Sequence, residues 1–164
     1  MSLSPLQLNS FRLIHVRVDA HKNYRGDKNR EADYTIETEF DVLKAKNKML
    51  FRVPLSFHIC AKTGNSHCNI KRLDINVEGI FVLPEDLPED MVQKLVPYNC
   101  LAILYSLSRG LILGITGTVP GGAFLLPTLD FTSIIREKIR QESEKEIKNN
   151  TARKGRAARH RALR

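Results

Sequence analysis

Two histidines and two cysteines that lie close together in the sequence could bind zinc. They are His58, Cys60, His67 and Cys68, and imidazole and thiolate groups are ligands that zinc prefers in proteins. The alternation of an extended strand places His58 and Cys60 on one face. His67 and Cys68 are adjacent, so an extended chain points them to opposite faces and one of the four would miss the metal. We therefore expect a polar hairpin with a partly exposed thiol and no metal.

A glycine-rich stretch, "GITGTVPGGAFLLP" at residues 114–127, could cradle a phosphate group. Loops of the P-loop kind place a Lys after their last glycine, whereas here Gly122 is followed by Ala, Phe and Leu. From residue 95 to residue 129 the only charged side chain is that of Arg109, so a bound polyanion would meet almost no counter-charge. We expect no nucleotide or other cofactor, and we interpret the stretch as a flexible apolar loop.

Catalytic signatures are weak throughout the chain. Ser106 and Ser108 lie in an apolar segment without a His nearby in the sequence, and no paired carboxylates or His-Glu signature stand at the end of a predicted strand. Serines at helical spacing are usually small packing residues. We therefore expect a binding protein and not an enzyme.

Acidic residues alternate along one predicted strand. Glu37, Glu39 and Asp41 point one way while Tyr34, Ile36, Phe40 and Val42 point the other, as in a half-buried strand. Such a stripe is most often a solvated face of a sheet. Its functional interpretation is a docking surface for a basic partner.

Most of the net charge of +8 comes from residues 151–164, "TARKGRAARHRALR", which hold six Lys and Arg residues and no acid. Such a segment could neutralise the phosphates of RNA or of a ribosome, but it lacks aromatic residues on which bases could stack. We expect residues 149–164 to be a disordered basic tail after a domain of residues 1–148. A nucleic-acid- or ribosome-associated function through this tail is the alternative to the function inferred below.

Four stretches show the alternation of half-buried strands: residues 11–18, 33–42, 50–60 and 70–82. The links after the second and third strands are short and polar. Consecutive strands are therefore expected to pair as an antiparallel meander with one solvent-exposed face. The prediction is an α+β fold in which a four-stranded antiparallel sheet precedes the helices.

A long apolar helix is predicted from Pro97 to about Ile115. It has little polar face, and because one sheet covers only one stripe of a helix, the remaining stripe should meet a second chain. Asp130 is suited to cap a final helix. The residues expected at the interface between chains are Leu101, Leu104, Tyr105 and Leu111.

The composition is that of one globular domain, with 164 residues of which 42% are hydrophobic. Three cysteines fit reduced thiols, and the first residues lack the pattern of a signal peptide, so a cytoplasmic location is expected. The longest charge-free run, Gly110–Leu129, contains five glycines and two prolines and lacks the apolar density that membrane insertion needs.

Four short motifs follow one another in a fixed order. They are Gly79-Ile80-Phe81 at the end of the last strand, Pro97-Tyr98 and Ser108-Arg109-Gly110 along the main helix, and Leu129-Asp130-Phe131 before the final helix. With these motifs the chain resembles the SecB export-chaperone family, in which Asn is more usual at the position of Asp130. The resemblance covers roughly residues 10–145. The chain departs from the family in a longer segment between Gly110 and Phe131 and in its basic C-terminus, which does not match the tails that serve the SecA translocation ATPase.

This resemblance implies an ATP-independent holdase that keeps polypeptides unfolded, assembled as a homotetramer from two dimers. The clients would be preproteins for export or an antitoxin of a toxin–antitoxin–chaperone module, and the departures favour the latter kind of relative. The apolar loop and a lid-like final helix would then border the client groove. Its expected lining residues are Ile80, Phe81, Tyr98, Phe124, Leu125, Leu126, Phe131, Ile134 and Ile135.

Overall fold

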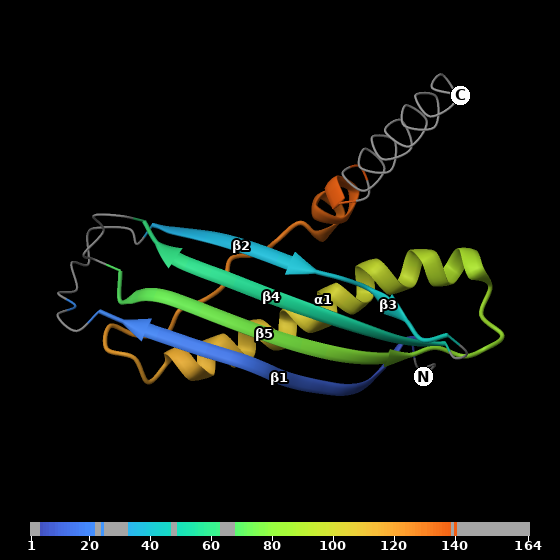
Figure 1. Ribbon diagram of the computed structural model, residues 1–164, viewed down its shortest axis with the longest axis horizontal. Coiled ribbons are helices and arrows are strands. Elements are labelled where there is room, and N and C mark those ends of the chain that lie inside the picture. Colours follow the sequence, from blue (N-terminus) through green and yellow to red (C-terminus); the bar gives the residue numbers. More distant parts are fainter. Residues whose placement is uncertain are drawn as a thin grey trace, which may run out of the picture. The chain divides into compact units, whose positions relative to one another are not determined.

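The computed structural model describes residues 4–21, 24, 33–46, 49–62, 68–138 and 140. The chain forms two units, one up to Thr128 and one from Leu129 onward, and each is described by itself. The first unit contains the sheet and the long helix (Figure 1). The basic segment 151–164 and His67 lie outside the described residues.

The sheet contains every strand that the alternation predicts. All pairings are antiparallel, and the order is β1-β5-β4-β2, with the short strand β3 also paired to β4 (Figure 1). The expected α+β architecture is confirmed, and β3 is an addition to the four predicted strands. The strand bounds are Gln7–Ala20 for β1, Tyr34–Phe40 for β2, Leu43–Lys44 for β3, Leu50–Ala61 for β4 and Ile70–Val82 for β5.

The predicted meander is wrong for the first two strands. β1 pairs with β5 and β2 pairs with β4, so these two strands lie on opposite sides of the central pair. Alternation fixes which face of a strand is buried, but it does not fix which strand lies beside it. The long connection between Ala20 and Tyr34 leaves β1 free to reach the far side of the sheet.

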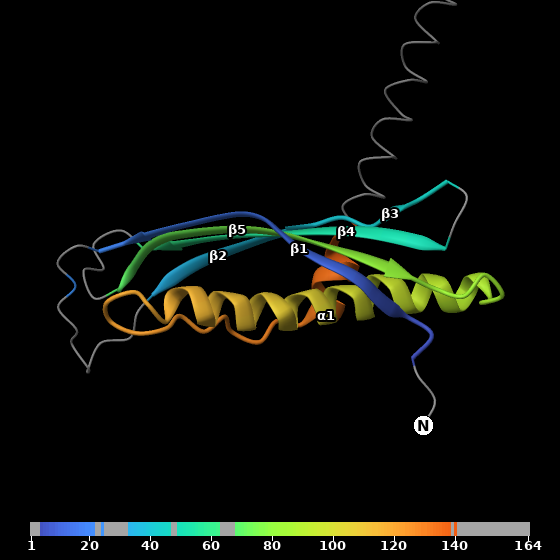
Figure 2. The same ribbon diagram turned by 90° about the horizontal axis from the view of Figure 1, so that it is seen from below.

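The core lies between one face of the sheet and the long helix α1, which spans Glu89–Thr116 (Figure 2). On β4 and β5 every second side chain is completely or almost completely buried on this face, and α1 contacts β1, β4 and β5. The buried strand residues include Val53, Leu55, Phe57, Ile59, Leu73, Ile75, Val77 and Phe81.

Gly79 lets the helix approach β5 closely. A Cβ atom at this position would lie 2.6 Å from Cδ2 of Leu104 and 2.7 Å from Cε2 of Phe81, and both distances are far below van der Waals contact. The glycine of the Gly79-Ile80-Phe81 motif is therefore required by the packing of α1 on the sheet.

The helix begins earlier than predicted, at Glu89, with Pro88 as the N-cap and Pro97 inside it. An internal proline costs an α-helix about 3 kcal/mol. The first two turns bury Val92 and Val96, and burying an aliphatic side chain contributes about 1.5–3 kcal/mol, so the packing of the first turns offsets the cost of Pro97. A start inferred from Pro97 overlooks this tertiary contribution.

Among the described residues, α1 is the one helix long and apolar enough to cross a membrane by length and composition. The core helix of a protein without a membrane span meets the same criterion. Here α1 buries one of its faces on the sheet, which accounts for much of its apolar character.

The second unit begins with a helix that includes residues 131–138. Asp130 caps it as predicted, because its Oδ1 accepts hydrogen bonds from the backbone N–H groups of Thr132 (3.0 Å) and Ser133 (3.3 Å). The side chain of Ser133 also donates to Oδ2 at 2.6 Å. These hydrogen bonds from Ser133 hold the pKa of Asp130 below its usual value, so the cap is charged at neutral pH.

Candidate polypeptide-binding surface

One face of α1 is committed to the core of its own chain. Leu101, Leu104 and Tyr105 are buried, and the Tyr105 ring lies 5.7 Å from that of Phe57 on β4. These three residues were expected at an interface between chains, and here their side chains are buried within their own chain; their place at an interface stays a prediction. Only Leu111 of the expected interface residues keeps partial exposure.

The opposite face of α1 is apolar and open. Leu107 and Leu113 are 39% and 43% exposed, and sequence reasoning missed both because every face of this helix is rich in Leu and Ile. Small residues follow one another at four-residue intervals along the same side, and a Cβ atom at Gly110 or Gly114 would meet nothing within 4 Å. The exposed small residues are Ala102, Ser106, Gly110 and Gly114.

Arg109 is the only charged residue between residues 95 and 129. Arg109 is half-buried, and within the described residues its buried Nε has no hydrogen-bond partner. Burial raises the pKa of the neighbouring Tyr105, and the charge of Arg109 opposes that shift. Tyr105 is thus a neutral hydrogen-bond donor over the physiological range, and it donates to the carbonyl oxygen of Pro127.

Residues 117–128 return along the side of α1 on the same face of the sheet (Figure 2). Gly121 and Gly122 make the reversal, both with φ of 97°, a value that glycine adopts readily. The returning chain is then fixed at Phe124, whose N–H donates to Oγ1 of Thr116 at 2.8 Å. The predicted loop is therefore helical up to Thr116, and it is held in place beyond Gly122.

The three apolar residues after this turn alternate in burial. Phe124 is half-buried and its ring makes an edge contact with Tyr34, with centroids 4.9 Å apart, while Leu126 is completely buried. Between them Leu125 is 58% exposed. Burial of Tyr34 raises its pKa, so this edge contact involves a neutral phenol. The segment thus presents Leu125 to solvent from a backbone anchored on both sides.

The remaining expected lining residues do not all come together. Ile80 and Phe81 are adjacent on β5, so their side chains lie on opposite faces, Phe81 in the core and Ile80 on the face away from α1. Tyr98 is half-buried on α1. Phe131, Ile134 and Ile135 share one face of the helix in the second unit by their spacing. Within the first unit the structure brings together Phe124, Leu125 and Leu126, and it separates Ile80 from them.

A second apolar surface lies on the edge strand β1. Leu13, Ile14 and Val16 are all exposed, and among the described strands β1 pairs with β5 alone. A long edge strand with exposed apolar side chains is a template for pairing with another chain. The alternation in residues 11–18 predicted a strand here, but its place at the edge depends on the order of strands.

The acidic stripe lies where alternation places it, on the sheet face away from α1. Glu37 and Glu39 are exposed on β2, opposite His58 and Ser56 of β4, and Asp41 follows the strand. Among the described residues neither Glu37 nor Glu39 forms an ion pair. Two other acids on this face are neutralised, since Asp74 pairs with Arg72 at 2.6 Å and Glu78 pairs with Arg52 at 2.6 Å.

The three candidate metal ligands that the structure describes, His58, Cys60 and Cys68, do not lie in one environment. His58 and Cys60 lie together on the outer face, with Nε2 of His58 3.3 Å from Sγ of Cys60. Cys68 is completely buried and its thiol is 3.6 Å from the carbonyl oxygen of Asp33. Within the described residues no group of three or more potential ligands could hold a metal ion.

The fold is similar to that of a SecB-like chaperone from Mycobacterium tuberculosis, whose structure was solved in complex with a ChAD peptide from the HigA1 antitoxin. The TM-score is 0.58 at 19% sequence identity, and the match covers 76% of this chain and 91% of that one. The predicted SecB-like fold is thus confirmed.

A protein of unknown function from Streptococcus agalactiae matches with a TM-score of 0.41 at 11% identity, over 75% of this chain and 97% of that one. No family model and no curated protein matches the sequence.

Proposed function

We propose that this chain is an ATP-independent chaperone that holds non-native polypeptides against the apolar surface formed by residues 117–127 and the adjoining side of α1. One observation carries the proposal. Leu125 is 58% exposed beside the half-buried Phe124, in a stretch where Arg109 is the only charge between residues 95 and 129. Non-directional apolar contact suits clients that have no fixed shape, and the SecB-like fold supports the same role.

A dedicated antitoxin is the client that we favour over a preprotein destined for export. The similar chaperone of Mycobacterium tuberculosis was solved with an antitoxin peptide, which supports a polypeptide client of that kind. The acidic residues Glu37, Glu39 and Asp41 would then serve as a docking surface for a basic partner, either a translocation ATPase or a toxin–antitoxin component. The proposed role involves binding without catalysis, in the cytoplasm.

A homotetramer built from two dimers is part of the proposal. Two exposed apolar surfaces support it, the edge strand β1 with Leu13, Ile14 and Val16, and the open face of α1 with Leu107 and Leu113. Soluble monomers rarely leave contiguous apolar patches of more than a few hundred Å² exposed. Chains associated through both surfaces would cover them and leave Leu125 for the client.

The client surface is tested by replacing Leu125 with Ser. Loss of a buried leucine contact of about 1.5–3 kcal/mol lowers affinity for an unfolded client by at least about tenfold, while the fold persists because the side chain is exposed. The measurements are affinity for a permanently unfolded test protein and suppression of its aggregation.

The matched control is Thr128→Ser, an exposed position of the same segment, which should behave like the parent. The double variant Phe124→Ser/Leu125→Ser should lose more affinity than Leu125→Ser alone. Parental affinity in both the single and the double variant, with the oligomer intact, would place the client elsewhere.

A further inference from the structure

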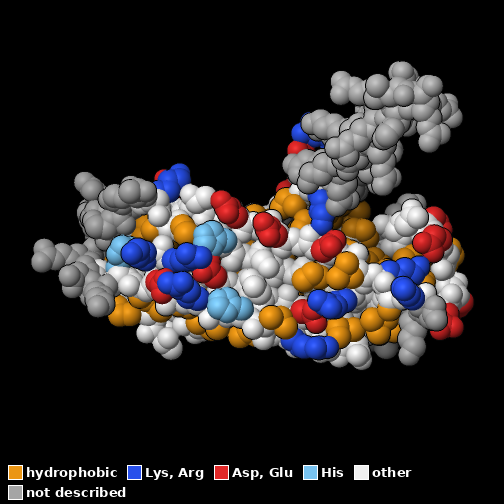
Figure 3. Space-filling view, viewed as in Figure 1, with side chains coloured by type: hydrophobic (Ala, Val, Ile, Leu, Met, Phe, Trp, Pro, Cys, Tyr) orange, Lys and Arg blue, Asp and Glu red, His pale blue; other side chains and the backbone are white. Residues whose placement is uncertain are grey.

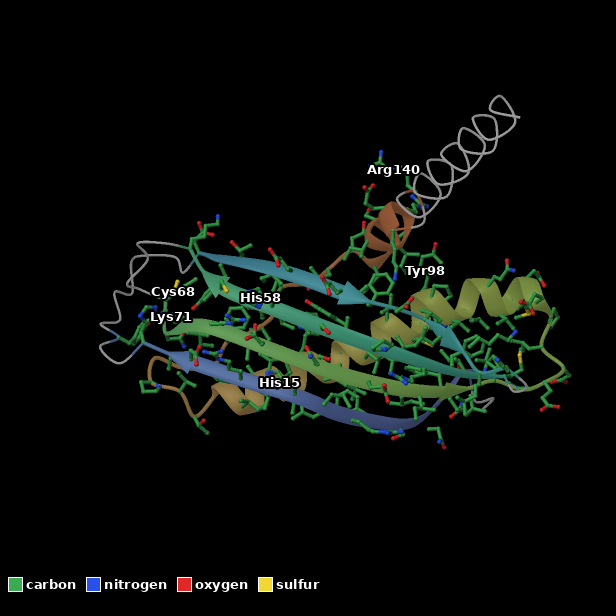
Figure 4. The ribbon with its side chains drawn as sticks, viewed as in Figure 1. His15, His58, Cys68, Lys71, Tyr98 and Arg140 are labelled. Atoms are coloured by element: carbon green, nitrogen blue, oxygen red, sulfur yellow. The ribbon has the colours of Figure 1, made fainter. Side chains whose placement is uncertain are left out.

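A thiol, an imidazole and a carboxylate stand in line on the sheet face opposite α1. Sγ of Cys60 is 3.3 Å from Nε2 of His58, and Nδ1 of His58 contacts Oδ1 of Asp74. His58 and Cys60 share a face of β4, and Asp74 lies directly opposite His58 on β5. Figure 4 shows His58 on this outer face, with His15 on β1. The three groups follow the order of a catalytic triad, in which a nucleophile contacts a base and an acidic residue orients that base.

Asp74 is held so that it orients the imidazole. Its Oδ2 accepts a hydrogen bond from Nε of Arg72 at 2.6 Å, and its side chain is only 15% exposed. Burial by itself would raise the pKa of Asp74, but the hydrogen bonds from Arg72 and His58 outweigh it and hold the pKa below its usual value. The charged carboxylate accepts the Nδ1–H of His58, which leaves the lone pair on Nε2 facing the thiol.

Space for a small molecule adjoins the sulfur. A depression of about 510 Å³ on this face is lined by Thr35, Glu37, His58, Cys60, Ala61 and Lys62. Figure 3 shows basic, acidic and His side chains gathered over the same part of the sheet. The depression is open to solvent, so a reagent can reach Cys60 without disturbing the core.

The other two cysteines lack this environment. Cys68 and Cys100 are completely buried, and burial raises the pKa of the Cys100 thiol to about 12. Buried thiols in apolar surroundings are inert. Within the part of the chain that the structure describes, Cys60 alone among the three has a base at hydrogen-bonding distance, an adjoining depression and partial exposure.

We propose that Cys60 is a nucleophilic thiol, served by His58 as base and Asp74 as positioning residue, that forms mixed disulfides with low-molecular-weight disulfides. Nε2 of His58 takes the thiol proton, and the thiolate attacks one sulfur of the disulfide. A bond forms between Sγ of Cys60 and that sulfur, and the original sulfur–sulfur bond breaks. The leaving thiolate takes the proton from the imidazolium. Cys60 is thereby oxidised and half of the small disulfide is reduced to a free thiol.

Charged side chains from three neighbouring strands surround the pair. Arg72 lies directly opposite Cys60 on β5, and Lys62 beyond β4 pairs with Asp33 at 2.9 Å. On β2, Glu37 lies opposite His58. From β1, Arg17 and Asp19 lie opposite Asp74 and Arg72. A modification here adds bulk beside Glu37, within the proposed docking surface.

The test is the rate of adduct formation with oxidised glutathione on the full chain, followed by intact-protein mass spectrometry. One adduct per chain is expected, and Cys60→Ser should abolish it. A free thiol is only about 3% ionised at pH 7, so the base can increase the rate by at most about thirtyfold. We expect His58→Asn to lower the rate about tenfold at pH 7 and to match the parent at pH 10, where the thiol ionises unaided.

Three comparisons keep the proposal falsifiable. His15→Asn, on β1, changes a residue that lines a neighbouring depression with His58 and Asp74 but does not line the depression beside Cys60, and this variant should react at the parental rate. Asp74→Asn should lower the rate at pH 7 in the same pH-dependent way as His58→Asn, and His58→Gln serves if the Asn variant does not fold. An adduct on Cys68 or Cys100 in place of Cys60, no adduct, or an unchanged rate at pH 7 in the folded His58 variant would each overturn it.

Discussion

Gly79 is the residue at which the sheet tolerates no side chain. Because an added Cβ would lie 2.6 Å from Cδ2 of Leu104 and 2.7 Å from Cε2 of Phe81, Gly79→Ala must displace the side chains of both residues, and overpacking of this kind costs about 1–3 kcal/mol. We expect a lower free energy of unfolding, measured by urea denaturation.

Gly110→Ala is the matched control, because its Cβ would meet nothing within 4 Å. Removing a glycine from an exposed helical position adds about 0.5–1 kcal/mol of stability. The close approach of helix and sheet would be disproved by a Gly79→Ala variant as stable as the parent.

Helix α1 has one face in the core and one open face. Leu104 and Leu107, three residues apart, lie on different faces and test this division. Leu104 is completely buried and Leu107 is 39% exposed. Leu104→Ala should destabilise the fold by about 2–5 kcal/mol, while Leu107→Ser should leave the free energy of unfolding of the isolated chain nearly unchanged.

The same Leu107 variant reports on the proposed assembly. If the open face of α1 is covered by a second copy, Leu107→Ser should lower the apparent mass at micromolar concentration in light scattering. A variant that keeps the full mass of the parent would mean that Leu107 lies outside the contact between chains.

The two faces of α1 could not be separated from the sequence, whereas those of the strands could. Alternating polar and apolar residues identify the inner side chains of β4 and β5 one by one. In α1 both Leu104 and Leu107 are apolar, so no period in the sequence tells the buried one from the exposed one. Only the position of Gly79 beneath Leu104, which depends on tertiary packing, makes the distinction.

The cluster of Cys60, His58 and Asp74 on the sheet face opposite α1 could also be predicted only in part. Strand alternation brings His58 and Cys60 together, and the sequence predicts this contact. Asp74 joins them only because β4 and β5 pair in the register that places it opposite His58. That register depends on the connection between the two strands, so the third member of the cluster follows from the fold and not from a motif.

For the whole molecule, the basic segment at residues 151–164 distinguishes the two classes of function. Cutting the chain after Asn150 removes six positive charges and none of the buried residues in the part of the chain that the structure describes. We expect oligomer formation and suppression of aggregation to persist, and any association with RNA to be lost, since such association rests on phosphate neutralisation and weakens steeply with salt.

The measurement is aggregation suppression by the 1–150 fragment at low and high salt, beside RNA binding by the full chain. Loss of suppression at both salts with the oligomer still assembled would identify the basic segment as the functional part, and with it a nucleic-acid- or ribosome-associated protein.

The order of strands has a consequence for how the chain is made. Ala20 of β1 pairs with Ile70 and Gln7 pairs with Val82, so β1 is synthesised before the other strands of this sheet but waits for the last of them to find its partner. At about 10 residues per second of synthesis, β1 waits roughly 5 s or more for β5, and contacts so distant in sequence form slowly. During that interval Leu13, Ile14 and Val16 are unpaired on a nascent strand. A protein proposed to protect other chains from aggregation is itself exposed to that hazard while it is being synthesised.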